Sequence, residues 1–93
     1  MKVQVEYTGQ LRTVAGRSVD RVELPDGSTL SELLLHLGTQ FEHVRPHLMN
    51  SSGQIQPSLL VAINGAAQPS RQAASTLLRE GDAVVLLPPI AGG

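Results

Sequence analysis

The sequence predicts an α+β domain in which one main helix crosses a mixed sheet. Three observations indicate this fold class. Apolar and polar residues alternate over residues 3–7, one strongly amphipathic helical pattern spans residues 29–40, and two further apolar segments follow, over residues 59–63 and 83–87. Because strand patterns lie on both sides of the helix in the chain, we expect the helix to pack on a sheet to which both halves contribute.

The N-terminal segments are expected to form an antiparallel hairpin. Residues 3–7 show the period of two that is typical of a half-buried strand. A second alternating segment, SVDRVELP (residues 18–25), runs into a turn at residues 25–27. Glycines bracket the connection between the two segments, in which we expect Leu11 and Val14 to point inward.

The main helix carries the clearest signal in the chain. Thr29 stands three residues before Glu32, the spacing of a capping box that satisfies free backbone N–H groups at a helix start. Apolar residues then recur at i, i+3, i+4 and i+7, and Phe41 extends the same face. We therefore predict a helix over residues 29–40 whose apolar stripe faces the sheet. The stripe consists of Leu30, Leu33, Leu34 and Leu37.

The second half of the chain is expected to complete the sheet. Residues 42–58 are predicted to form a loop region, with room for a short helical turn before Pro46. LLVAING (residues 59–65) is typical of a buried strand that ends in an Asn-Gly hairpin turn, and AAQP (residues 66–69) should form a short return strand. STLLREGD indicates a helical turn or loop, and AVVLLPP (residues 83–89) is the predicted last strand.

A hairpin crossed by one helix and closed by further strands is the β-grasp arrangement. In it the final strand lies beside the first, inside the sheet, so the chain leaves from the middle of a rigid sheet. We expect a single domain over residues 1–93, with a tail that starts at about residue 88 and projects from a fixed point.

Composition excludes several classes of partner. The 93 residues carry a net charge of −1, no basic run and only two aromatic side chains, which argues against binding of nucleic acid. The longest apolar stretches, residues 33–35 and 59–63, are far shorter than the roughly 20 residues of a membrane span, so no membrane association is expected. The start, MKVQVEYTG, lacks a hydrophobic signal region, and we expect a cytoplasmic protein.

No metal site is expected. The chain contains no cysteine, which excludes disulfides, thiolate ligands and a thiol nucleophile. Three histidines, His36, His43 and His47, are present, and the last two have i, i+4 spacing. However, Pro46 between them is expected to break helical geometry, and no carboxylate completes a metal-binding motif. Solvated surface histidines are the simpler interpretation.

The body of the sequence contains no catalytic pattern. None of the serines or threonines lies in a nucleophile-elbow motif, and no glycine-rich loop follows a strand as a phosphate-binding loop requires. Glu80 and Asp82 form a carboxylate pair by spacing, but REGDAV is more simply a turn that enters a strand. We therefore expect no catalytic residues and no bound cofactor.

The C-terminal stretch LLPPIAGG (residues 86–93) is the unusual feature that remains. Two prolines fix φ and stiffen the exit, and two glycines remove all Cβ bulk. Such a tail can enter a narrow channel in a partner and present the carboxylate of Gly93 there. The alternative interpretation is a frayed end or a cloning remnant.

Three segments resemble a known family: REGDAVVLLPPIAGG (residues 79–93), QLRTVAGR (residues 10–17) and VELPDGSTLSELLLHL (residues 22–37). They are similar to the small subunit of molybdopterin synthase and to the wider ubiquitin-like sulfur-carrier family. The resemblance covers nearly the full length, and its most specific motif is the terminal Pro-Pro-x-x-Gly-Gly. It implies a ubiquitin-like β-grasp fold, in agreement with the predicted order of elements.

The resemblance also implies a chemistry for the tail. Gly93 matches the modified glycine and Gly92 its neighbour. A ubiquitin-activating-type enzyme would use ATP to adenylate the terminal carboxylate, and sulfur transfer would then give a thiocarboxylate that donates sulfur to a biosynthetic substrate. The tail segment that lies in partner active sites corresponds to Pro88, Pro89, Ile90 and Ala91.

Molybdopterin synthesis is the pathway that the resemblance favours, with the large subunit of molybdopterin synthase, or another sulfur-accepting synthase, as a second partner. The residue chemistry agrees, because a sulfur carrier without cysteine must hold sulfur elsewhere, and an activated carboxyl terminus is available. The alternatives are a carrier for cysteine or thiamine biosynthesis, a protein modifier conjugated through Gly93 to target lysines, and an inert interaction domain. The single lysine, Lys2, argues against lysine-linked chains but not against single attachment.

A docking face for partners is expected on the sheet beside the tail. Leu86 and Leu87 are the candidates, because they directly precede the tail. Strand alternation directs one of them toward the core and the other outward. An outward apolar side chain beside a functional tail indicates an interface.

Overall fold

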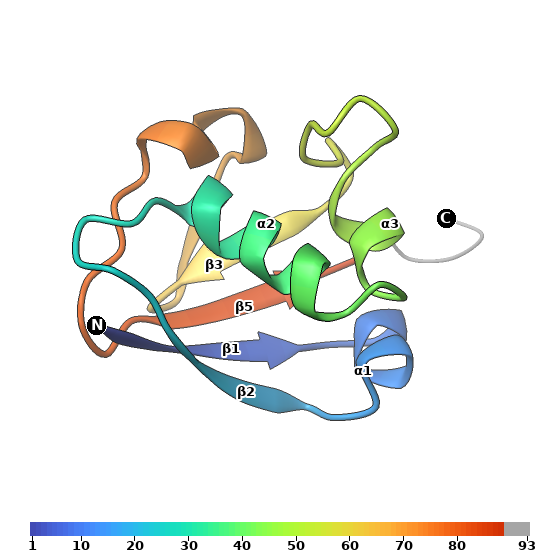
Figure 1. Ribbon diagram of the computed structural model, residues 1–93, viewed down its shortest axis with the longest axis horizontal. Coiled ribbons are helices and arrows are strands. Elements are labelled where there is room, and N and C mark those ends of the chain that lie inside the picture. The colour runs from blue at the N-terminus through green and yellow to red at the C-terminus, as the bar shows by residue number, and fades with distance from the viewer. Residues whose placement is uncertain (89–93) are drawn as a thin grey trace.

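The computed structural model describes residues 1–88, and its sheet and helices follow the predicted order (Figure 1). No helix in these residues is long and apolar enough to cross a membrane. The elements, in chain order, are β1 (Lys2–Tyr7), α1 (Gln10–Ala15), β2 (Val19–Glu23), α2 (Leu30–Gln40), α3 (Arg45–Leu48), β3 (Leu60–Ile63), β4 (Ala66–Gln68), the 3-10 helix η1 (Ser70–Ser75) and β5 (Ala83–Leu87).

The five strands form one mixed sheet in the order β2-β1-β5-β3-β4. β1 pairs with β2 antiparallel and with β5 parallel, so the last strand lies inside the sheet beside the first, as the sequence predicts. Both β1 and β5 run toward the end of the sheet where α1 and α3 lie (Figure 1). The β-grasp prediction is confirmed, and the end of β5 is held between two neighbouring strands.

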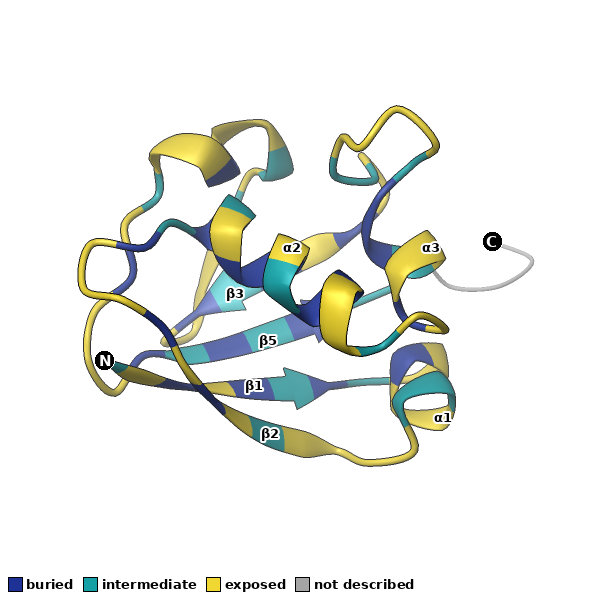
Figure 2. Ribbon diagram, viewed as in Figure 1, coloured by how far each residue is buried: buried dark blue, intermediate teal, exposed yellow. Residues whose placement is uncertain are grey.

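The core lies between α2 and one face of the sheet. Along β1, buried residues alternate with exposed or partly exposed ones, and Figure 2 shows buried and partly buried residues alternating along β5. The predicted stripe of four leucines on α2 is fully buried, which confirms its assignment. No helix covers the opposite face in Figure 1, and this face is called the open face below.

The start of α2 has the predicted capping box. Thr29 Oγ1 accepts a hydrogen bond from the backbone N–H of Glu32 at 3.2 Å, and the Thr29 N–H donates to Glu32 Oε1 at 3.1 Å. Two of the helix's otherwise unsatisfied backbone donors are thereby paired. The helix ends at Gln40, within the predicted boundaries.

The structure differs from the prediction in two connections. Leu11 is buried as expected, but it lies on a short helix, α1, which ends at Gly16 in a left-handed conformation (φ 76°). Six residues are too few for a helical pattern to be recognised, because such a helix is stable only through its packing. The short helical turn expected before Pro46 is α3, which contains Pro46 in its first turn, where a backbone N–H has no intrahelical partner. His43 precedes this helix, so His43 and His47 do not lie on one helix, as the sequence predicts.

The second half agrees with the prediction more closely. Asn64 and Gly65 form the hairpin turn, with φ values of 51° and 85° that suit a tight two-residue connection. Residues 42–58 contain α3 and an isolated bridge between Met49 and Ile55, and are otherwise turns. The segment predicted as a helical turn or loop, residues 75–82, is a loop apart from its first residue, and the 3-10 helix η1 precedes it.

Candidate functional site

The end of β5 is the root of the predicted tail. Its last paired residues are held on one side by Thr8, whose N–H and Oγ1 both donate to the carbonyl oxygen of Leu86, at 3.3 and 2.9 Å. Pro88, the last described residue, is half-buried. The chain therefore leaves a fixed point in the centre of the sheet. The remaining predicted tail residues, Pro89, Ile90, Ala91, Gly92 and Gly93, lie outside the described residues.

The start of β5 is also fixed. Asp82 is buried and accepts hydrogen bonds from the side-chain amide of Asn64 at 2.9 Å and from the backbone N–H of Arg79 at 2.8 Å. Asn64 Oδ1 in turn accepts from the N–H of Ala83 at 2.9 Å. The carboxylate of Asp82 thus joins the β3–β4 turn to the loop before β5, which supports the structural interpretation of REGDAV. The sequence predicts Asn64 as a turn residue, but nothing in it indicates that the Asn64 side chain bonds Asp82 and Ala83.

The two leucines before the tail point to opposite faces. Leu86 is 0% exposed and belongs to the core, so its inclusion in the docking face is wrong. Leu87 is half-buried on the open face, opposite Leu60 in the antiparallel pairing of β3 and β5. Strand alternation required one of the two leucines to point outward, and the structure shows that it is Leu87.

Leu87 belongs to an apolar strip on the open face. Leu60, beside it, is 63% exposed and is a residue that the sequence analysis missed. Its position one residue before Val61 and three before Ile63, which are buried, was the available signal. Register places the remaining members on the same face. The apolar strip consists of Leu60, Ala62, Ala67, Val85 and Leu87.

The other half of the open face is mainly polar and charged, with Val19, which is 41% exposed, as an apolar exception opposite Glu6. On β1 and β2, Lys2 lies opposite Glu23 and Gln4 lies opposite Arg21. These pairs are exposed and carry both signs, which is typical of a solvated strand face. The open face is therefore divided along its length, and the apolar half is the half that contains the strand leading into the tail.

The described residues contain no group of His, Cys, Asp and Glu that could hold a metal ion. His36 is half-exposed on α2, His43 is exposed in the turn before α3, and His47 lies on α3. The three histidines therefore come from three separate places. Of these, His47 lies near the tail root, where it lines a small notch together with Pro88.

The only titratable group with a clearly shifted pKa in residues 1–88 is structural. Burial and a hydrogen bond to Asp20 raise the pKa of the Tyr7 hydroxyl above its ordinary value. The hydroxyl donates to Asp20 Oδ2 at 2.9 Å, and Arg17 pairs with the same carboxylate at 3.2 Å while stacking on Phe41 at 4.3 Å. This cluster joins β1, β2 and the end of α2, and nothing in it is placed to act on a substrate.

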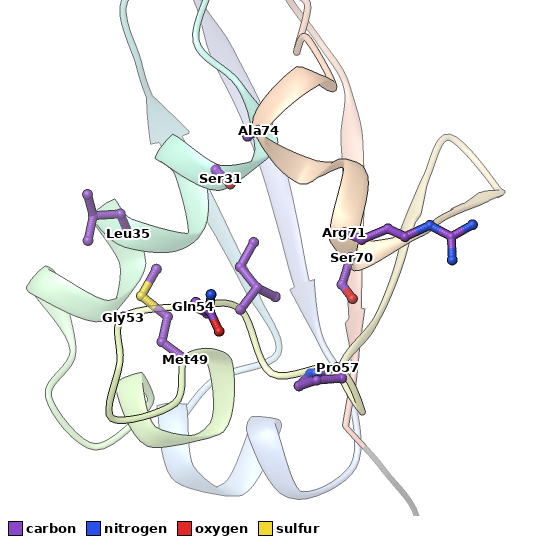
Figure 3. A pocket seen from close by; sticks show the side chains of 10 residues that line it. Ser31, Leu35, Met49, Gly53, Gln54, Pro57, Ser70, Arg71 and Ala74 are labelled. Atoms are coloured by element: carbon purple, nitrogen blue, oxygen red, sulfur yellow. The ribbon is translucent and has the colours of Figure 1, made fainter.

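A cavity of about 590 Å³ lies between α2, the segment after α3, and η1 (Figure 3). Its walls include Leu35, Met49 and Pro57, and Arg71 is its one charged lining residue. Figure 3 shows the guanidinium of Arg71 directed away from the middle of the cavity. An acid–base pair or an activated nucleophile is absent from this lining, so the cavity has no groups for catalysis.

Comparison with known proteins supports the architecture over the whole chain. The model of the ThiS family matches residues 5–93. Small archaeal modifier protein 3 of Haloferax volcanii is 27% identical over 93 residues, which span all of both chains. The relative thus aligns with this chain from end to end.

Solved structures agree in fold. SAMP1 from Haloferax volcanii superimposes with a TM-score of 0.89 at 24% identity over all of both chains. A putative molybdopterin converting factor subunit 1 from Pyrococcus furiosus gives 0.77 at 24% identity, with 97% of this chain and 99% of that chain covered. A chain of the BexX/CysO complex from Amycolatopsis orientalis superimposes with a TM-score of 0.73 at 22% sequence identity. The match covers 98% of this chain and 99% of that chain. At these identities the likeness shows the fold alone.

The family model spans nearly the entire sequence, and the β-grasp sheet, the main helix and the central last strand agree with it. The family consists of small ubiquitin-like sulfur carriers and protein modifiers rather than catalytic proteins, and related members work with partner enzymes. The chain belongs to the ThiS family.

Proposed function

We propose that this protein is a sulfur carrier whose Gly93 carboxylate is adenylated and converted to a thiocarboxylate that donates sulfur in molybdopterin synthesis. One observation carries the proposal. The tail PPIAGG (residues 88–93) follows a strand that is paired on both sides and is fixed at its end by Thr8, so the root of the tail has a defined position. A carrier needs this property, because its partner must find the terminal carboxylate at a reproducible distance from the surface that it binds.

The chemistry needs no catalytic group from the carrier. A carboxylate oxygen of Gly93 attacks the α-phosphate of ATP, and pyrophosphate leaves, which gives an acyl adenylate. A sulfide-level nucleophile then attacks the acyl carbon and AMP leaves, which gives the thiocarboxylate directly. If the nucleophile is instead the terminal sulfur of a persulfide, the product is an acyl disulfide, and attack of a thiol on the donor's sulfur releases the thiocarboxylate and leaves a disulfide. ATP is held by the adenylating partner, so the carrier binds no cofactor of its own. The lack of catalytic clusters in residues 1–88 is compatible with this role.

The apolar strip is the proposed docking face for the adenylating partner, a ubiquitin-activating-type enzyme. Leu87 ends the strand that leads into the tail and Leu60 lies beside it, so a partner that covers both residues also meets the start of the tail. Exposed apolar side chains gathered on one face are typical of a protein interface. The large subunit of molybdopterin synthase, or another sulfur-accepting synthase, would use the same tail after activation, and both steps would take place in the cytoplasm.

A second function, conjugation through Gly93 to amines of target proteins, is favoured by a specific observation. The curated relative that aligns over the whole chain is named a small archaeal modifier protein. Sulfur transfer for cysteine or thiamine biosynthesis uses the same thiocarboxylate chemistry and differs from molybdopterin synthesis only in the acceptor.

Mass spectrometry of the protein from its native cells tests these functions. A carrier should give a C-terminal peptide in which one oxygen is replaced by sulfur, and this form should accumulate when the sulfur-accepting synthase is deleted. A modifier should leave a Gly-Gly remnant on lysines of other proteins. Cells that contain neither product would contradict both functions, and accumulation after deletion of one synthase identifies the pathway.

A further inference from the structure

Part of the chain between α2 and β3, residues 46–58, lies beside the tail root at Pro88. A notch of about 160 Å³ adjoins Pro88 and is lined by residues from three parts of the chain: the start of α1, α3, and the segment after the Met49–Ile55 bridge. In Figure 1, α1 and α3 lie at the end of the sheet toward which β5 runs. The lining residues are Gln10, Pro46, His47, Gln56 and Ser58.

Residues 46–58, which form most of the notch, are held in place by specific contacts. Leu48 and Met49 are buried in the core and attach this segment to it. The side-chain amide of Gln56 donates to the carbonyl oxygen of Pro46 at 3.2 Å, and its backbone N–H donates to that of Leu48 at 2.9 Å. Asn50 Oδ1 accepts from two backbone N–H groups of the following turn, each at 3.0 Å. These contacts hold the segment in one conformation beside Pro88.

Residues 55–58 border both spaces. Ile55 and Pro57 line the large cavity beside α2, together with Gln54, whereas Gln56 and Ser58 line the notch. Pro57 and Ser58 form a turn, in which the Leu59 N–H donates to the carbonyl oxygen of Gln56 at 3.0 Å. This short stretch therefore separates the cavity from the notch.

The chemistry of the notch contrasts with that of the apolar strip. The polar side chains in it carry an amide, a hydroxyl or an imidazole, and none is a carboxylate, a lysine or an arginine. Gln56 uses its amide within the segment, while the hydrogen bonds among residues 1–88 do not engage the side chains of Gln10, His47 and Ser58. Three groups that can donate or accept hydrogen bonds thus lie beside the tail root, and no hydrogen bond within residues 1–88 engages them.

We infer that Gln10, His47 and Ser58 form a second docking site for the adenylating enzyme. This site contacts the rim of the enzyme's channel that receives the tail. The inference rests on the proposed function. An enzyme that encloses the tail from Pro88 onward also covers the notch, which adjoins Pro88. Polar groups buried there need hydrogen-bond partners, so the matching rim presents uncharged donors and acceptors, such as backbone amides and carbonyls. An enzyme whose channel rim has another shape or carries charged groups should bind the carrier more weakly. The notch would therefore help the carrier to distinguish among adenylating enzymes.

Two charged substitutions test the second docking site: Ser58→Arg and Gln10→Arg. Both positions are exposed, Gln10 at the start of α1 and Ser58 in the turn before β3, so neither change is expected to unfold the protein. The matched control is Ser51→Arg, an exposed serine of the same segment that does not line the notch. The assay is ATP–pyrophosphate exchange with the purified adenylating enzymes of the source organism, with the carrier as the varied substrate and its fold checked by thermal melting.

A rise of the KM for the carrier by about tenfold or more is expected for both notch variants, with kcat within about twofold of wild type. The control should match the wild-type protein. An unchanged KM in both notch variants, or an equal rise in the control, would overturn the second docking site while the proposed function stands. No exchange with the wild-type protein and any of these enzymes would overturn the proposed function and the inference together.

Discussion

The face of the sheet that α2 covers and the face left open carry similar residues in different surroundings. On the covered face, Leu86 from β5 and Leu34 from α2 are both 0% exposed. On the open face, Leu87 from the same strand is half-buried, and its neighbour Leu60 is 63% exposed. One strand therefore supplies a core residue and a surface residue of the same type in consecutive positions.

The difference teaches that the position of a leucine, rather than its residue type, decides whether it stabilises the fold or remains available to bind a partner. Leucines on the covered face stabilise the fold because their apolar area is removed from water when the chain folds. Leu60 keeps most of its area exposed and contributes to stability only slightly, so its area remains available to a partner. Substitutions on the two faces should accordingly change different measured quantities.

The largest effect is expected at the tail, which the open face leads into. Deletion of Gly93 should abolish adenylation, because one extended residue spans about 3.3–3.6 Å and a misplacement of about 1 Å already costs about a hundredfold in rate. ATP–pyrophosphate exchange with the activating enzyme measures this. The free energy of unfolding should not change, since residues 1–88 contain the core. Equal exchange by the shortened chain would show that Gly93 is not the reacting residue.

On the covered face, Leu34→Ala should lower the free energy of unfolding by about 2–5 kcal/mol, because it leaves a cavity in a fully buried site. Urea denaturation monitored by circular dichroism measures the change. Leu35→Ala is the matched control, since this neighbouring leucine is 55% exposed and should cost less than about 1 kcal/mol. Similar losses for the two variants would remove the distinction between the covered and exposed sides of α2.

On the open face, Leu87→Asp should weaken binding to the activating enzyme by about tenfold or more, because a charge would be buried in an apolar interface. Isothermal titration calorimetry gives the dissociation constant. Leu35→Asp introduces the same charge at an exposed leucine on the other side of the molecule and should bind like the wild-type protein. Unchanged affinity in Leu87→Asp would exclude the apolar strip as the docking face.

The smallest effect is expected at Tyr7, which carries a hydroxyl and is buried on the covered face beside the valines of β1. Tyr7→Phe removes the hydrogen bond to Asp20 and should cost about 0.5–1.5 kcal/mol at neutral pH. Because the folded protein raises the pKa of this hydroxyl above its ordinary value of 10.0, the folded state retains the proton more strongly than the unfolded state. The wild-type protein should thus lose stability above about pH 10, and this part of the loss should be absent in Tyr7→Phe.

Alkaline unfolding of the two proteins measures that difference. The chain contains no other tyrosine, so ultraviolet absorbance reports the ionisation of Tyr7 directly. Ionisation near the ordinary pKa in the folded protein would contradict the inferred burial of the hydroxyl.

Much of the fold could be predicted because the relevant signals are local. The capping box at Thr29 and Glu32 and the leucine stripe of α2 follow from spacing along one helix, and the turn at Asn64 and Gly65 follows from backbone preference. The short helix α1 could not be predicted, because its six residues have too little pattern of their own and depend on the burial of Leu11. The position of α3 relative to Pro46 could not be predicted either, because proline is accepted in the first turn of a helix as well as after its end.

The sequence by itself determined the order of the strands, the main helix and the composition of the tail, since period, capping and proline or glycine content are properties of neighbouring residues. Only the tertiary structure decided which of Leu86 and Leu87 faces outward, that Leu60 lies beside Leu87, and that Ser58 borders the tail root. These relations depend on register and on how distant segments pack together. A one-residue shift in strand register exchanges the two faces of a strand, and no local pattern records which distant segment will lie beside it.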